Sequence, residues 1–119
     1  MASTAKVLVL LIALVHVYIL VLEMFLWRTR ALRIFGMTAA QAEATAELAK
    51  NQGLYNGFLA AGLIWADLSP SDFAPRATFF LACVLCAGLY GAATANKRIL
   101  FVQALPAAVA LAVVGLSLR

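Results

Sequence analysis

The sequence predicts an all-α protein, an antiparallel four-helix transmembrane bundle, from its composition, its length and four long apolar stretches. Hydrophobic residues make up 66% of the chain and charged residues only 12%, and the mean hydropathy is +1.00. A water-soluble domain typically carries about 25% charged residues, so this composition excludes an ordinary soluble fold. The 119 residues accommodate four membrane-spanning helices of about 20 residues each, plus short loops, in a single integral membrane domain, residues 1–119.

The first apolar stretch, residues 7–27, stops at a cluster of arginines that begins with Arg28. It is too long for the apolar region of a signal peptide, and no small-residue cleavage site follows it, so we expect it to remain as a helix. The second stretch, residues 51–68, ends before Pro70, because proline cannot continue the hydrogen-bond ladder of a helix.

The third and fourth apolar stretches, residues 77–95 and 99–118, are separated only by the short turn 96–98. Because this turn leaves no room for a crossover, the sequence predicts that the two helices form an antiparallel hairpin. Pro106 is expected to kink the fourth helix, since it removes a backbone hydrogen bond and crowds the preceding turn.

Charge asymmetry predicts the orientation of the four spans in the cell membrane. Four spans place both termini on one side, and the loop after the first span and the turn after the third span on the other. Six basic residues lie on the second side and three on the first: Arg28, Arg30, Arg33, Lys50, Lys97 and Arg98 against Lys6, Arg76 and Arg119. The second side is therefore expected to be cytoplasmic and both termini extracytoplasmic. The basic residues form no continuous stripe, so we expect no nucleic-acid partner.

The loop between the first two spans, residues 28–50, is expected to contain a short cytoplasmic amphipathic helix. Thr38 and Gln41 have the spacing of a capping box, and residues 39–50 are rich in strong helix formers. We expect this helix to lie on the membrane and to lead into the second span. Its charged residues are interpreted as a solvated face, and the arginines before it either anchor the loop or hold an anionic head group.

Two ionisable residues lie inside the first apolar stretch, Glu23 about one turn from its cytoplasmic end and His16 near the middle of the bilayer. Burial of an ionisable group in hydrocarbon costs roughly 2.5–3.5 kcal/mol on insertion scales. Because the two residues are seven apart, they lie two helical turns from each other on one face. An ionisable group at this depth predicts a functional site.

Polar side chains of the other spans lie at the same depth as Glu23, counted inward from the cytoplasmic boundary. They are Gln52, Tyr55 and Asn56 in the second span, Tyr90 in the third and Gln103 in the fourth. Exposure of any of these polar side chains to lipid costs free energy. We therefore expect them to turn inward and meet the Glu23 carboxylate. Two interpretations remain open. The amides either only satisfy the carboxylate and hold the bundle together, or they line a polar pocket that opens towards the cytoplasm, which we favour.

His16 is interpreted either as a hydrogen-bonding strut or as the axial ligand of a haem, which needs a single imidazole from each protein side. One histidine cannot form a zinc site by itself, so no bound metal ion is expected. Cys83 and Cys86 lie within a continuous apolar stretch without a neighbouring basic group, and we interpret them as packing residues.

The runs HVYILVLEMFLW from His16 to Trp27 and NQGLYNGF from Asn51 to Phe58 resemble the small membrane proteins of domain-of-unknown-function family 1304. The resemblance covers nearly the whole chain, with its length and its four spans, and it implies the fold. The signature positions that it implies are His16, Glu23, Asn51, Gln52, Tyr55 and Asn56. We expect a homo-oligomer, because a single short bundle has a limited interior and its stripes of small residues offer further contact surfaces. The overall plan is also similar to the small four-helix glutathione and eicosanoid enzymes, a resemblance that implies a trimer.

We therefore expect an intramembrane pocket that binds a small lipophilic or amphipathic molecule, and that in one interpretation transforms it by acid/base or isomerase-like chemistry. Glu23 would be the acid/base or ion-pairing group, and His16 a deeper polar contact or cofactor ligand. The side chains expected to bind and orient the ligand are Asn51, Gln52, Tyr55, Asn56, Tyr90 and Gln103. Two alternatives stay open, a proton-coupled exporter of small lipophilic cations and a structural partner of another membrane protein.

Overall fold

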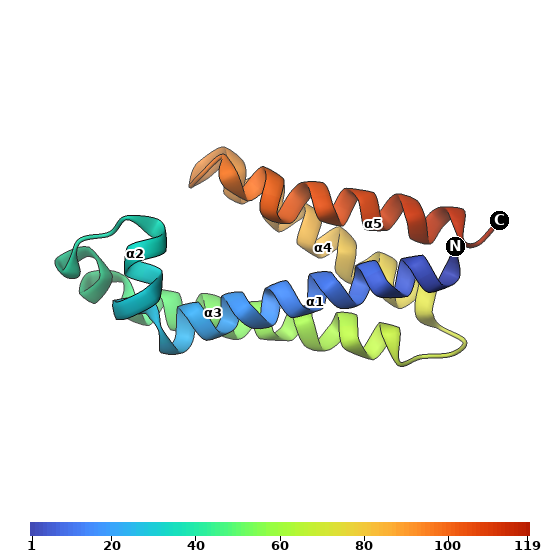
Figure 1. The fold of residues 1–119 in the computed structure, drawn as a ribbon, viewed down its shortest axis with the longest axis horizontal. Coiled ribbons are helices and arrows are strands. Elements are labelled where there is room, and N and C mark those ends of the chain that lie inside the picture. Colours follow the sequence, from blue (N-terminus) through green and yellow to red (C-terminus); the bar gives the residue numbers. More distant parts are fainter. The chain divides into compact units, whose positions relative to one another are not determined.

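Every regular element of the chain is helical, and no strand is present. The computed structural model describes all residues, 1–119. Four longer helices follow one another along the chain, namely α1 (Ala2–Phe25), α3 (Ala39–Asp67), α4 (Phe73–Thr94) and α5 (Leu105–Leu116) (Figure 1). Between them lie the short helix α2 (Leu32–Phe35) and two π-helical segments, η1 (Trp27–Ala31) and η2 (Leu100–Ala104). The predicted all-α class is confirmed.

The chain divides into two compact units, and each is described by itself. The first, here called the α4–α5 unit, consists of residues 1–13 and 61–119. The second, here called the α1–α3 unit, consists of residues 14–60. Helices α1 and α3 each contribute residues to both units.

Helices α1 and α4 are long and apolar enough to cross a membrane. The apolar segment Leu100–Leu116, which comprises η2 and α5, is shorter. Both α1 and α4 begin a few residues earlier than the apolar stretches predict, because the residues before these stretches also tolerate a helix. Pro75 lies in the first turn of α4, where its missing N–H leaves no hydrogen bond unmade.

Helix α3 is one unbroken helix, so the loop helix and the second span expected from the sequence are not separate elements. The chain has no glycine or proline between Thr38 and Gly53 that would interrupt the helix. Its start is the predicted capping box. The Thr38 backbone N–H donates to Oε1 of Gln41 at 2.9 Å, and the Gln41 N–H donates to Oγ1 of Thr38 at 3.1 Å.

The end of α1 is marked by a change of helical register. Leu26 departs from helical geometry, with φ −121° and ψ 18°, and the Ala31 N–H donates to the Leu26 carbonyl oxygen five residues back, at 2.9 Å. The wider turns of η1 follow, and α2 ends at Gly36, whose φ of +64° is left-handed and suits glycine. This sequence of turns brings Trp27 and Arg28 back towards α3.

The distortion expected at Pro106 takes the form of the π-helical segment η2 immediately before it. The Leu105 N–H donates to the Leu100 carbonyl oxygen, five residues back, and Pro106 then lies in the first turn of α5. Proline is tolerated there because the N–H that it lacks has no partner to lose. A wide turn therefore replaces the expected kink within a continuous helix.

Helices α4 and α5 pack side by side as the antiparallel hairpin that the sequence predicts (Figure 1). At Gly88, α4 lies close against η2, and an added Cβ there would lie 2.7 Å from the backbone nitrogen of Ala104. The hairpin buries small and medium apolar side chains, which are Ala77, Leu81 and Val84 of α4 and Ala107, Ala110 and Val114 of α5.

A cluster of cation and aromatic contacts joins three segments of the α4–α5 unit. The Arg76 guanidinium lies 4.1 Å from the centre of the Trp65 ring, donates to Oγ of Ser69, and pairs with Asp72 at 3.0 Å. Nearby, the Lys6 Nζ of α1 donates to the backbone oxygen of Asp67 at the end of α3, at 2.9 Å. These contacts hold the start of α1, the end of α3 and the start of α4 together.

Candidate functional site

Glu23 of α1 and Asn56 of α3 are joined directly within the α1–α3 unit. Asn56 Nδ2 donates to Oε1 of Glu23 at 2.7 Å, and it also donates to the Gln52 backbone oxygen at 3.1 Å. The two helices approach closely here because Gly53 has no side chain. A Cβ at that position would lie 2.6 Å from Cγ of Met24. Of the contacts expected for the carboxylate, the structure shows the one with Asn56.

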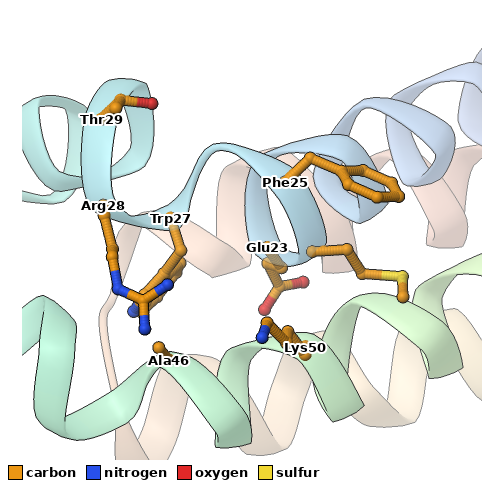
Figure 2. Close-up of a pocket in the computed structure, with 8 residues that line it drawn as sticks. Glu23, Phe25, Trp27, Arg28, Thr29, Ala46 and Lys50 are labelled. Atoms are coloured by element: carbon orange, nitrogen blue, oxygen red, sulfur yellow. The ribbon is translucent and has the colours of Figure 1, made fainter.

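A small cavity of about 130 Å³ lies beside the Glu23 carboxylate (Figure 2). Its lining comes from three elements: Glu23, Met24 and Phe25 of α1, Trp27, Arg28 and Thr29 of η1, and Ala46 and Lys50 of α3. The lining thus combines one carboxylate, two cations and a mostly apolar wall, all contributed by the α1–α3 unit. Polar groups of both signs therefore meet apolar surface in one place.

The two cations of the lining each have a carboxylate partner on α3. Arg28 binds Glu43 through two hydrogen bonds, from Nε to Oε2 at 2.6 Å and from Nη2 to Oε1 at 3.1 Å. Lys50 Nζ pairs with Oε1 of Glu47 at 3.1 Å. Glu23 forms no ion pair. It is thus the carboxylate of this unit that meets only a neutral hydrogen-bond donor.

The Arg28–Glu43 contact is exposed, and it still shifts the pKa of both side chains. The hydrogen bond and then the charge of Arg28 lower the pKa of the Glu43 carboxyl, and the same hydrogen bond and charge raise the pKa of Arg28. Each partner therefore favours the charged form of the other. The bidentate geometry holds the η1 end of the cavity against α3.

Trp27 is held over the cavity by two contacts. Its indole Nε1 donates to Oγ1 of Thr45 at 3.0 Å, and the Thr45 hydroxyl in turn donates to the Gln41 backbone oxygen at 2.7 Å. The Trp27 ring also meets the Phe35 ring, with the ring centres 5.8 Å apart. These contacts orient the indole as part of the cavity wall, a role that the sequence does not suggest.

None of the polar residues predicted in the second span lines this cavity, and Asn56 reaches it only through its hydrogen bond to Glu23. Asn51 and Gln52 are exposed, and Nδ2 of Asn51 donates to the Glu47 backbone oxygen at 3.0 Å. Tyr55 is 61% exposed, and its ring meets Phe58 edge to face. Only Asn56 of the predicted group turns towards α1 and Glu23.

His16 is 1% exposed and is buried within the α1–α3 unit, and it does not line the cavity. Tyr90 and Gln103 belong to the α4–α5 unit, where Tyr90 is 73% exposed and Gln103 is half-buried. Their expected meeting with Glu23 stays a prediction.

No cluster of three or more His, Cys, Asp or Glu side chains is arranged to hold a metal ion, and Cys83 and Cys86 are free thiols.

A regular stripe on α3 carries the signal that selects Asn56 over its polar neighbours. Buried small residues recur at alternating spacings of four and three, which are Ala42, Ala46, Ala49, Gly53 and Ala60. Asn56 occupies the next position of this repeat after Gly53, and it is the polar residue in the stripe. This heptad-like repeat marks the face that packs on α1. Lys50 follows Ala49 at its edge, although the sequence alone assigns it to a solvated face.

The fold and the site together define a class, an apolar helical protein with a carboxylate and an amide joined between two helices beside a small cavity. Residues 10–115 match the family described as protein of unknown function (DUF1304), and the chain belongs to this family. It is 36% identical over 100 residues to "Uncharacterized protein YpaA" of Lactococcus lactis subsp. lactis (strain IL1403), a match that covers 82% of this chain and 84% of that protein. No solved structure matches the chain.

Proposed function

We propose that the protein is a multi-pass protein of the cell membrane, with four spans and both termini extracytoplasmic. The proposed spans are α1, residues 51–67 of α3, α4, and η2 with α5. Support comes from the apolar length of α1 and α4 and from large apolar side chains that stay exposed on the helices, among them Leu10, Leu14, Phe79, Leu89 and Phe101. Such surfaces are costly in water and suit contact with lipid.

Cysteine labelling tests this topology. In a Cys83→Ser, Cys86→Ser background, single cysteines replace Ser3 or Lys97 in intact cells. A membrane-impermeant maleimide should modify the Ser3→Cys protein directly and the Lys97→Cys protein only after permeabilisation. Labelling of both from the outside would contradict the four-span orientation.

We further propose that the Glu23 cavity binds a small amphipathic molecule. The observation that carries this proposal is the Glu23–Asn56 hydrogen bond beside a cavity of about 130 Å³. Apolar and small-residue packing is available to hold α1 against α3, so a half-buried carboxylate at their contact has a cost that packing does not require. A binding role for the carboxylate accounts for this cost.

The size of the cavity indicates how such a ligand would bind. Pockets for whole drug-sized ligands measure roughly 300–1,000 Å³, and this cavity is smaller. It therefore suits the polar head of an amphipathic molecule, with the apolar remainder in the bilayer. Glu23 would accept a proton or a hydrogen bond from the head group, and Asn56 would hold the carboxylate in place.

Intrinsic fluorescence provides the test. The chain has two tryptophans, so a Trp65→Phe variant leaves Trp27 in the cavity wall as the reporter. The purified full chain in dodecyl maltoside micelles is titrated with four amphiphiles that share a dodecyl chain: N-dodecylglycine, dodecylamine, dodecanoate and dodecanol. We expect a saturable change in Trp27 emission with at least one of them.

Two alanines of α3 provide a matched pair of variants for this titration. Ala46→Leu adds a side chain where Ala46 lines the cavity, whereas Ala44→Leu adds the same side chain at an exposed position. The emission change should be lost in the first variant and kept in the second, with circular dichroism confirming equal helicity. If no amphiphile gives a saturable change, or if both variants respond alike, the cavity is not a binding site.

A further inference from the structure

Opposite charges face the same cavity without pairing with each other. Glu23 enters it from α1 and Lys50 from α3, and both side chains point into the shared space (Figure 2). Each is engaged elsewhere, since Glu23 accepts from Asn56 at 2.7 Å and Lys50 pairs with Glu47 at 3.1 Å. Both charged groups therefore line one cavity without forming an ion pair with each other.

Both charges keep hydrogen-bonding capacity for a ligand. Asn56 engages Oε1 of Glu23, which leaves Oε2 as an acceptor. The Lys50 ammonium uses one of its three donors on Glu47. Arg28 uses Nε and Nη2 on Glu43, so its Nη1 group stays available as a further donor. The cavity thus offers an anionic acceptor from α1 and cationic donors from η1 and α3.

Charge complementarity separates the possible head groups. A cationic head group would satisfy Glu23 and face the positive charges of Lys50 and Arg28. An anionic head group would satisfy Lys50 and Arg28 and face the Glu23 carboxylate. A neutral head group would displace water from all three charged groups and would form no ionic contact to compensate for the lost hydration. A head group with both signs meets every charge of the lining, which minimises the desolvation cost.

On the basis of the proposed function, we infer that the Glu23 cavity takes a zwitterionic head group, an ammonium and a carboxylate separated by one or two carbons. The ammonium donates to Oε2 of Glu23, and the carboxylate accepts from Lys50 and from Nη1 of Arg28. The apolar chain of the ligand leaves along Met24 and Phe25, which are the apolar members of the lining on α1. No bond is made or broken in this step.

The four dodecyl amphiphiles test this head-group class, because they share one tail and differ only in charge. Binding is measured by Trp27 emission in the Trp65→Phe protein at about pH 8, where amines are protonated and carboxylic acids ionised. N-dodecylglycine, which carries both charges, should bind with an affinity about tenfold or more above that of dodecanol. Dodecylamine and dodecanoate should bind more weakly than N-dodecylglycine.

Two near-isosteric variants assign each charge to its partner. Glu23→Gln should lower the affinity for N-dodecylglycine and dodecylamine, and it should raise the affinity for dodecanoate, because it removes a like charge from the cavity. Lys50→Gln, at an exposed position that tolerates substitution, should lower the affinity for N-dodecylglycine and dodecanoate, and it should raise the affinity for dodecylamine for the same reason. Lys97→Gln removes a charge from the turn in the α4–α5 unit. It should leave the affinity for all four amphiphiles unchanged.

The outcomes separate this inference from the proposed function. If dodecanol, dodecylamine or dodecanoate binds as tightly as N-dodecylglycine, the cavity binds amphiphiles and the zwitterionic class is wrong. If Glu23→Gln and Lys50→Gln lower the affinity for the same amphiphiles equally, the two residues do not contact separate charged groups of the ligand. The inference again fails in that case. If none of the four binds, the proposed function fails with it.

Discussion

Oε1 of Glu23 accepts a 2.7 Å hydrogen bond from Nδ2 of Asn56, across the contact between α1 and α3. Asn56 lies in a stripe of alanines and glycine on α3, and Gly53 one turn earlier allows the backbones to approach. The polar pair thus occurs beside a position where a glycine leaves no room for a side chain between the two helices. Its stability and its role in binding are separately testable.

Removal of the Asn56 amide should destabilise the protein. Asn56→Ala is expected to lower the free energy of unfolding by about 1 kcal/mol, because the Glu23 carboxylate loses its hydrogen-bond donor while it stays partly buried. Unfolding titrations in mild detergent measure this change. Asn51→Ala is the matched control, since Asn51 is exposed and contacts only its own helix, and its effect should lie near zero. Equal losses of unfolding free energy in the two variants would show that the hydrogen bond from Asn56 to Glu23 does not stabilise the protein.

Two glycines of the α4–α5 unit should respond in opposite ways to alanine. Gly88→Ala places a Cβ 2.7 Å from the Ala104 backbone nitrogen, so α4 and η2 must separate, at a cost of about 1–3 kcal/mol. Gly115→Ala meets no atom within 4 Å and should be neutral or stabilise α5 by about 0.5–1 kcal/mol. Thermal unfolding of the two variants checks the difference, and a stable Gly88→Ala protein would contradict the close packing.

The Arg28–Glu43 pair should depend on pH in a direction set by the lowered pKa of Glu43. A carboxyl whose pKa is lower in the folded state stabilises the fold above its unfolded pKa, and this stabilisation is lost as the pH falls through the folded value. Carbon-13 NMR of the Glu43 carboxyl reports the titration. In the Arg28→Gln protein, the pKa of Glu43 should return towards its ordinary value.

Arg33→Gln provides the control for this titration, because Arg33 forms no ion pair. It should leave the pKa of Glu43 unchanged, and added salt should weaken the shift in the unsubstituted protein, since both partners are exposed. A Glu43 titration that responds equally to both arginine substitutions would mean that long-range charge, and not the bidentate contact, causes the shift.

Arg76 should matter more for stability than its charge alone suggests. Arg76→Gln loses the contact with the Trp65 ring, the hydrogen bond to Ser69 and the pair with Asp72, at an expected cost of about 1–2 kcal/mol. Arg119→Gln, at the exposed end of the chain, should change stability by less than about 0.5 kcal/mol. A ranking in which the two variants are equal would show that the cluster contributes nothing to the fold.

Local features of the fold were predictable because they depend on neighbours in the chain. The capping box of Thr38 and Gln41 forms as its spacing predicts, and the short turn 96–98 produces the expected hairpin. Pro106 distorts the backbone as expected, although the distortion is spread over a preceding π-helical segment. The missed feature is the continuity of α3, where the change from polar to apolar composition indicated a boundary that the backbone does not have.

Composition and helical spacing, on their own, determined the all-helical class and the presence of a costly carboxylate at Glu23, and the runs from His16 to Trp27 and from Asn51 to Phe58 indicated the family by resemblance. Only the tertiary structure decided which polar residue meets it. Asn51, Gln52, Tyr55 and Asn56 lie within two turns, and spacing leaves open which of them faces α1. The rotation of α3 about its axis was set by the packing of its small residues against α1, so Asn56 turned inward and Lys50 reached the cavity edge. The repeat of small residues on α3 marks the face that packs, but which group of α1 meets that face depends on the surface of α1, which the sequence of α3 does not contain.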